Sequence, residues 1–209
     1  MLLNFDYDGV IVDSLDQLVQ VAIQAQTGIG SGRTPSRRDF AVVENLTVEE
    51  VGREIGIPEV ELSRYVELFF EAQRKDTSKA SLYEGIFSTF KELAKKHTIV
   101  VITSSQSNAV RSALVEHGLE LYIADVLGGD VGNRKSDRIQ MMQSKFKIPS
   151  ESTFMIGDAV SDIREGKIAG VKTVAVTWGF QHLETLAKEE PDFIVDTPSD
   201  LLELFNYFS

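Results

Sequence analysis

The chain has 209 residues, 43% hydrophobic and 25% charged, which is typical of a globular protein with one core and room for a small second domain. Its formal net charge of −11 argues against a nucleic-acid partner bound by neutralising phosphates. It has no cysteine, no run of about 18 apolar residues and no start resembling a signal peptide, so disulfides and a membrane span are excluded and a cytoplasmic location is expected.

The first expected element is a short apolar strand followed by two acids. The strand covers Leu2–Phe5 and leads directly into Asp6, Asp8 and Gly9. Neighbouring carboxylates repel each other unless a cation lies between them or one of them holds a proton. A hard cation such as Mg²⁺ prefers carboxylate and carbonyl oxygens, and a protonated carboxyl can act as a general acid. The segment therefore predicts metal binding or acid–base chemistry at the end of the first strand.

Residues 15–81 have helical patterning. Two segments have the form of a capping box that starts a helix, Ser14–Gln17 and Thr47–Glu50, and apolar residues at helical spacing follow each of them. A third helix is expected over Val60–Arg74, and the segment Gly28–Ser36, rich in Gly and Ser, is expected to be a loop between helices. We therefore expect a small α-helical unit inserted into the chain.

The rest of the chain alternates strand-length apolar runs with stretches of helical spacing, such as Phe87, Phe90 and Leu93. Five further strands are expected, at Ile99–Ile102, Val126–Leu127, Phe154–Ile156, Thr173–Val176 and Phe193–Val195. This alternation predicts an α/β fold with a doubly wound parallel sheet covered on both faces. Residues 1–14 and 82–209 would form this core.

Three polar residues come directly after these strands. Asp6, Thr103 and Asp158 each follow an apolar run. In a doubly wound sheet the ligand lies at the carboxyl ends of the strands. We therefore expect these side chains to converge on one site, and this expectation depends on topology alone.

Four motif-like segments follow one another along the chain: Leu2–Ser14, Thr103 after its strand, Lys135, and Phe154–Asp162 with two aspartates four residues apart. In this order they resemble the four motifs of the haloacid dehalogenase superfamily, phosphatase branch. The segment Gly170–Phe180 resembles the phosphoglycolate-phosphatase-like subgroup in particular. The resemblance covers nearly the whole chain and implies a Rossmann-like core in which residues 15–81 form an α-helical cap.

The resemblance implies a role for each acid. Asp6 is expected to be the nucleophile, and Asp8 the general acid and then the general base, with its backbone carbonyl a metal ligand. Asp158 is expected to bind Mg²⁺ directly, and Asp162 to bind it or to hold a metal-bound water, with helix capping as the alternative for Asp162. We expect the side chains of Asp6, Asp8 and Asp158 to meet around one divalent ion.

The phosphate is expected to meet hydroxyl, amide and ammonium groups. Thr103 would offer its hydroxyl and its backbone N–H, with Ser104 beside it. Lys135 would neutralise charge on the nucleophile and the phosphoryl oxygens. The subgroup usually has proline after this lysine, but Ser136 follows here, so Arg134 is an alternative for the role.

These residues predict a Mg²⁺-dependent phosphatase that hydrolyses a small phosphomonoester through an aspartyl phosphate. The nearest alternative is β-phosphoglucomutase-like phosphoryl transfer, since such enzymes keep both acids of the first motif. A phosphoaspartate switch or a non-catalytic binding module is the alternative from another class. The expected partner is a small phosphorylated metabolite, with phosphoglycolate, a sugar phosphate and a nucleoside monophosphate all open, as is the oligomeric state.

Two groups of residues outside the motifs are expected near the site. Arg33, Arg37 and Arg38 in the cap are candidates for recognising a carboxylate or a second phosphate of the substrate. Trp178 and Phe180 are expected to pack beside the site rather than to contact the substrate.

Overall fold

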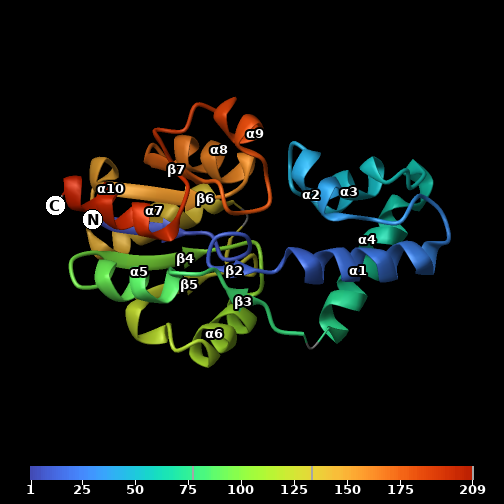
Figure 1. Cartoon of the computed structure of the whole chain (residues 1–209), viewed down its shortest axis with the longest axis horizontal. Helices are drawn as coiled ribbons and strands as arrows, with labels where there is room; N and C mark the ends of the chain where they lie inside the picture. Colours follow the sequence, from blue (N-terminus) through green and yellow to red (C-terminus); the bar gives the residue numbers. More distant parts are fainter. Residues whose placement is uncertain (77, 133, 209) are drawn as a thin grey trace.

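A computed structural model describes residues 1–76, 78–132 and 134–208. Its main element is a six-stranded parallel sheet in the order β5-β4-β1-β6-β7-β8 (Figure 1). The strands are β1 (Leu2–Phe5), β4 (Thr98–Ile102), β5 (Asp125–Leu127), β6 (Thr153–Gly157), β7 (Lys172–Val176) and β8 (Phe193–Val195). The chain moves from β1 first to one side and then to the other, which is the order of a doubly wound fold. The predicted fold class is confirmed.

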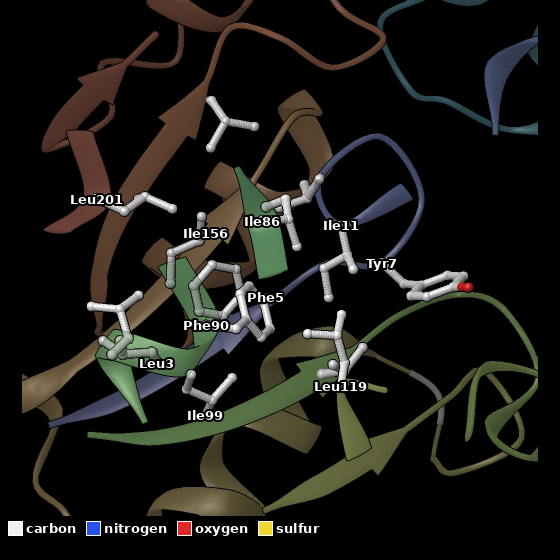
Figure 2. Packing of buried hydrophobic residues seen from close by; sticks show 14 of the residues in the cluster. Leu3, Phe5, Tyr7, Ile11, Ile86, Phe90, Ile99, Leu119, Ile156 and Leu201 are labelled. Atoms are coloured by element: carbon white, nitrogen blue, oxygen red, sulfur yellow. The ribbon is translucent and has the colours of Figure 1, made fainter. Parts of the chain in front are cut away.

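Helices cover both faces of this sheet. The helices that follow the strands of the core are α5 (Ile86–Leu93), α6 (Ser107–Glu116), α7 (Lys135–Phe146), α8 (Val160–Ile168), α9 (Leu183–Ala187) and α10 (Pro198–Tyr207), with short 3-10 turns η1 (Glu120–Tyr122) and η2 (Ser150–Ser152). In β1, Leu3 and Phe5 face the cluster formed with α5, α6 and α10 (Figure 2), whereas Leu2 faces the cluster on the side of α7. Because strand side chains alternate, a strand buried on both faces is apolar throughout, as the sequence indicated.

Only one face of the apolar helix α5 is buried. Ile86, Phe90 and Leu93 are buried against the sheet, and the rings of Phe90 and Phe5 lie 4.6 Å apart between centroids. Phe87 was expected in this stripe but is 43% exposed. Spacing alone did not reveal that Ile86, one residue earlier, begins the buried face.

Four helices between two short strands form the inserted segment, which lies apart from the sheet at the right of Figure 1. They are α1 (Leu15–Ile29), α2 (Arg37–Val42), α3 (Val48–Glu54) and α4 (Glu59–Lys75), and the flanking strands β2 (Val12–Asp13) and β3 (Ser81–Leu82) pair antiparallel. The helices enclose a hydrophobic cluster of their own, to which the core contributes Phe180. The insertion therefore has a separate apolar interior, joined to the core by a two-stranded ribbon.

The helical insertion differs from expectation in its details. The helix α1 continues through Gly28 to Ile29, so the loop begins later than expected. Thr47 Oγ1 accepts from the N–H of Glu50 at 3.2 Å, but the Glu50 carboxylate accepts from the N–H of Asn45, so only half of that capping box forms. The helix α2 was not predicted, because a helix of six residues is too short to show a period.

Two side chains tie the insertion to the core. Gln181 is buried; its Oε1 accepts from the N–H of Val160 at 2.6 Å, and its Nε2 donates to the carbonyl of Val43 at 2.6 Å. Arg164 in α8 forms an ion pair with Glu44. The loop after α2 is therefore anchored at the helix that follows β6.

Candidate active site

The strand order brings the residues expected at strand ends to one place. Asp6 follows β1, Thr103 follows β4 and Asp158 follows β6, and β1 is hydrogen-bonded to both of the other strands. The direction in which the chain winds reverses between β1 and β6, which is where doubly wound folds bind ligands. Asp162 lies in the first turn of α8, one turn beyond Asp158.

Three of these acids form a compact group of oxygen ligands. Asp6, Asp158 and Asp162 each offer a carboxylate oxygen, and these oxygens lie within 4.8 Å of one another. Asp158 and Asp162 are both 1% exposed. Asp162 Oδ2 also accepts from the N–H of Ala159 at 3.2 Å, so its helix-capping role exists beside its place in the group.

Lys135 lies between two of these acids. Its Nζ is 2.7 Å from Asp6 Oδ2 and 2.6 Å from Asp162 Oδ1. Burial alone would lower the pKa of this ammonium, but the attraction of the two carboxylates outweighs burial and holds the pKa above its usual value. Arg134 points elsewhere, with its Nη2 2.8 Å from Glu165 Oε1. Of the two basic neighbours, Lys135 is therefore the one that reaches the site.

The balance of charge in this group favours a divalent cation. Three carboxylates and one ammonium leave two negative charges. Burial first, and then repulsion from Asp162 and Asp6, raise the pKa of Asp158 well above its usual range. Burial likewise raises the pKa of Asp162 to about 6, although Lys135 opposes the shift. A hard cation with oxygen ligands relieves both the repulsion and the burial cost, so these residues fit a site for an ion such as Mg²⁺.

Two glycines make room for the Asp158 carboxylate. A Cβ added to Gly9, whose φ is +77°, would lie 2.1 Å from Asp158 Oδ2, and one added to Gly179 would lie 2.2 Å from Asp158 Cβ. The backbone N–H of Phe180 donates to Asp158 Oδ2 at 2.7 Å. The loops after β1 and β7 therefore close around this carboxylate and fix its direction.

The Asp8 carboxylate lies outside this group of ligand oxygens. Ser14 donates from Oγ to Asp8 Oδ1 at 2.6 Å, and Ser105 donates from Oγ to Asp8 Oδ2 at 2.6 Å. This corrects the expectation that the side chains of Asp6, Asp8 and Asp158 share one ion: both Asp8 oxygens are taken by hydroxyls, and the third acid is Asp162. The role of the Asp8 backbone carbonyl as a metal ligand stays a prediction.

Burial and the two serine hydroxyls shift the pKa of Asp8 in opposite directions. Burial raises the pKa of Asp8, and the negative charge of Asp6 adds to this effect. The two serine hydroxyls lower the pKa, since they donate to the ionised form. Ser14 was expected to cap α1, but the helix start has no side-chain capping bond and Ser14 binds Asp8 instead.

The loop after β4 presents fewer free groups than expected. The backbone N–H of Thr103 donates to the carbonyl of Leu127 at 3.1 Å, so it continues the sheet and is not free for a phosphate. Thr103 Oγ1 accepts from the N–H of Ser105 at 3.0 Å, which leaves its hydroxyl hydrogen available. Ser104 is exposed. Ser107, three residues further on, donates from its backbone N–H and from its hydroxyl to Asp130 Oδ1, which fixes the start of α6.

The segment after β7 contributes more than packing. Trp178 donates from Nε1 to the carbonyl of Val10 at 3.1 Å, which joins it to the loop after β1. Phe180 packs its ring in the cluster of the insertion while its N–H binds Asp158. Sequence reasoning missed the second function because a backbone N–H carries no residue-specific pattern.

The three arginines singled out in the insertion are engaged to different degrees. Arg33 donates from Nη1 to Asp39 Oδ2 at 2.8 Å within the insertion. Arg37 donates from Nε to Asp16 Oδ1 at 2.6 Å, near the ribbon that leads to the core. Arg38 is exposed. Their part in recognising a substrate stays a prediction.

Comparison with known proteins agrees with this arrangement. The family model for haloacid dehalogenase-like hydrolases matches residues 3–176. The chain belongs to this family. The prediction of a hydrolase of this type is therefore confirmed, and the match extends from β1 to the end of β7.

Relatives of this haloacid dehalogenase-like hydrolase match it over nearly its whole length. A phosphoglycolate phosphatase from Vibrio vulnificus is 32% identical over 222 residues, which cover 97% of this chain and 95% of that protein. A protein of the same name from Vibrio parahaemolyticus is 29% identical, with the same coverage. A solved haloacid dehalogenase-like family hydrolase from Streptococcus pneumoniae has a TM-score of 0.84 at 20% identity over 100% of this chain and 98% of that one, which shows a shared fold.

None of the described helices of this hydrolase has the length and apolar character needed to cross a bilayer.

Proposed function

We propose that this hydrolase is a Mg²⁺-dependent phosphatase that removes the phosphoryl group of a small phosphomonoester. The observation that carries the proposal is the position of Lys135 against Asp6, beside two further buried carboxylates. An ammonium beside an attacking carboxylate favours an anionic substrate that would otherwise be repelled. The relatives named phosphoglycolate phosphatase support the same reaction.

In the first step, a carboxylate oxygen of Asp6 attacks phosphorus in line with the leaving oxygen. The new bond to Asp6 forms as the bond to the leaving group breaks, and Asp8 gives its proton to the leaving alkoxide. Asp6 is suited to attack because Lys135 and the N–H of Tyr7 fix its two oxygens at 2.7 and 2.8 Å. Asp8 is suited to hold the proton because burial and the charge of Asp6 raise its pKa.

In the second step, water attacks the phosphorus of the aspartyl phosphate, and the ionised Asp8 accepts a proton from the attacking water. The P–O bond to Asp6 breaks, which releases inorganic phosphate and restores the Asp6 carboxylate. The two serines that bind Asp8 stabilise this ionised form, so the same carboxyl can serve both steps. When bound by Asp6, Asp158 and Asp162, Mg²⁺ would supply charge stabilisation for the phosphoryl oxygens. Lys135 would act on the same oxygens from the side of α7.

We further propose that residues 1–14 and 82–209 are the catalytic core and that residues 15–81 are a cap that covers the site and selects the leaving group. The separate hydrophobic cluster of the insertion and its two-stranded connection support this division. Phosphoglycolate is the first substrate to test, since it is named in the relatives. A cytoplasmic location is part of the same proposal.

A panel of phosphorylated metabolites tests the proposal. Phosphate release would be measured for phosphoglycolate, several sugar phosphates and nucleoside monophosphates, with Mg²⁺ and with a chelator. We expect Mg²⁺-dependent release from at least one of them. A product that appears only with a sugar bisphosphate activator would favour the phosphomutase alternative, and no turnover with a persistent phosphate on Asp6 would favour the phosphoaspartate switch.

A further inference from the structure

A buried arginine lies beneath the proposed phosphate site and has no part in the mechanism above. Arg138 lies in α7, one turn after Lys135, and is 3% exposed. Within residues 1–76, 78–132 and 134–208 no carboxylate forms an ion pair with it. An unpaired buried guanidinium is costly, so its hydrogen-bond partners indicate why it is tolerated.

Those partners are backbone carbonyls at the ends of two strands. Arg138 Nη1 donates to the carbonyl of Thr103 at 2.6 Å and to that of Leu127 at 3.3 Å. Its Nε donates to the carbonyl of Arg134 at 3.2 Å, which keeps the side chain folded back along α7. The guanidinium therefore joins the carboxyl ends of β4 and β5 where the phosphate is expected.

The bond to Thr103 involves the peptide that joins Thr103 to Ser104. A peptide group is planar, and in its trans form the C=O and the N–H point in opposite directions. Since the carbonyl points to Arg138, the N–H of Ser104 points away from it. Among the hydrogen bonds of the described residues this N–H has no acceptor.

A cation on the carbonyl strengthens the donor on the other side of the peptide. Hydrogen bonds in a chain polarise one another, and the effect is larger where the dielectric is low. Burial lowers the pKa of Arg138, and the negative charge of Asp6 opposes this shift, so the guanidinium interacts electrostatically with the site. Arg138 thus polarises the peptide between Thr103 and Ser104, which makes the free N–H of Ser104 a stronger donor.

We infer that Arg138 is a positioning residue that holds and polarises the Thr103–Ser104 peptide so that the Ser104 N–H binds an oxygen of the phosphoryl group. This rests on the proposed function, since it assigns a donor to the phosphate of that reaction. This role gives a reason for a second buried cation, Arg138, behind the site, in addition to Lys135, which contacts Asp6 and Asp162.

Another arginine provides a matched control. Arg111 Nη2 also donates to a carbonyl of β5, that of Val126, at 2.7 Å. It is half-exposed and forms an ion pair with Asp125. Arg111→Met therefore removes an arginine-to-carbonyl bond from the same strand without changing the end of the sheet that carries the site.

The test compares Arg138→Met, Arg138→Lys and Arg111→Met in the full chain with Mg²⁺ present. For Arg138→Met we expect the dissociation constant of inorganic phosphate and KM to rise about tenfold, with a smaller change in kcat. Arg138→Lys should recover part of this loss, and Arg111→Met should bind phosphate as the parent protein does. The ¹H resonance of the Ser104 amide should move upfield in Arg138→Met without phosphate.

A folded Arg138→Met variant that binds phosphate like the parent protein would overturn the inference. If that variant does not fold, the parent protein alone decides: the Ser104 amide must shift when phosphate saturates the site, and an unchanged resonance refutes its role as a donor. Failure of the proposed function looks different, because the parent protein would then hydrolyse no phosphomonoester. Turnover with an unchanged KM in Arg138→Met removes the inference and leaves the phosphatase intact.

Discussion

The carboxyl end of the sheet and the inserted helices treat charge in opposite ways. In the insertion, charged side chains pair with one another at the surface, as Arg53 does with Glu59 and Arg64 with Glu67. At the sheet, Asp158 is buried, and no ion pair of the described residues includes it. The first arrangement contributes little to stability because solvent screens the pairs, whereas the second costs stability until a ligand compensates the charge.

The contrast between paired and uncompensated charges indicates which region of the molecule is the functional site. The insertion has more ion pairs, and each acid in them has a basic partner; most lie at the surface, and the buried Asp39 is paired with Arg33, so no charge there is left uncompensated by its pair. The sheet end has an excess of two negative charges among Asp6, Asp158, Asp162 and Lys135, and all four are largely shielded from water. Perturbed, uncompensated groups of this kind mark functional sites.

The largest effect is expected from Asp6→Asn, which removes the proposed nucleophile. We expect kcat for phosphate release to fall by at least about 10³-fold, because an amide cannot form the phosphoryl intermediate. Thermal unfolding should change little, since lost repulsion from the other acids offsets the lost bond to Lys135. The surface variant Glu59→Gln is the control and should retain full activity. Wild-type turnover in Asp6→Asn would end the proposed mechanism.

Removal of Mg²⁺ should affect stability in a pH-dependent way. The raised pKa values of Asp158 and of Asp162, the latter about 6, mean that the metal-free fold binds protons more tightly than the unfolded chain does. Their contribution to the stability of the metal-free protein is therefore fully present below about pH 4, the unfolded pKa of aspartate, and is lost as the pH rises through about 6 for Asp162 and through the raised pKa of Asp158. Protons compete with the ion, so Mg²⁺ should raise the melting temperature more at about pH 7.5 than at about pH 5.5.

Differential scanning fluorimetry with Mg²⁺ or a chelator at both pH values measures this effect. The matched variant is Asp158→Asn, in which the stabilisation by Mg²⁺ should largely disappear. An equal rise in melting temperature at both pH values, or an undiminished rise in the variant, would contradict a site built from these carboxylates.

A smaller effect is expected from Ser105→Ala, which removes one of the two hydroxyls on Asp8. The pKa of Asp8 should rise further, because that hydroxyl stabilises the ionised form. We expect kcat to fall about tenfold and the pH–rate profile to move to higher pH, since the second step needs the ionised carboxyl. Ser88→Ala removes an exposed serine of α5 and should leave the profile in place. A profile that does not move in Ser105→Ala would separate Asp8 from proton transfer.

The smallest effect is expected from Arg53→Met, which breaks an exposed ion pair in the insertion. The midpoint of unfolding in a urea titration should hardly move, because solvent screens both partners. Activity should not change. A large shift of the urea midpoint would show that the exposed ion pairs of the insertion contribute more to stability than solvent screening predicts.

Sequence reasoning succeeded where topology alone decides the position of a side chain. Asp6 and Asp158 follow apolar runs, and parallel strands that lie side by side bring their carboxyl ends together. The choice between Arg134 and Lys135 could not be made in this way, since both are basic and adjacent. The register of α7 decides it, and that register depends on which residues pack against the sheet.

The remaining parts of the site depend on contacts between distant segments. Ser14 fits a capping box in the sequence, and only the return of the chain toward Asp8 reveals its other use. The N–H groups of Phe180 and Ser104 have no sequence pattern, because every residue other than proline has one. Arg138 looks like an ordinary helix-surface residue until α7 is placed against the ends of β4 and β5.

The central position of β1 has a consequence for how the protein is made. Its partners along the sheet are distant: Leu2 lies opposite Thr98 on one side and opposite Thr153 on the other. After β1 is synthesised, about a hundred further residues must follow before β4 exists and about 150 before β6 exists, and pairings so far apart in sequence form slowly. Asp6 is translated long before its surroundings, so a chain interrupted between β1 and β6 carries the proposed nucleophile without Asp158 or Asp162.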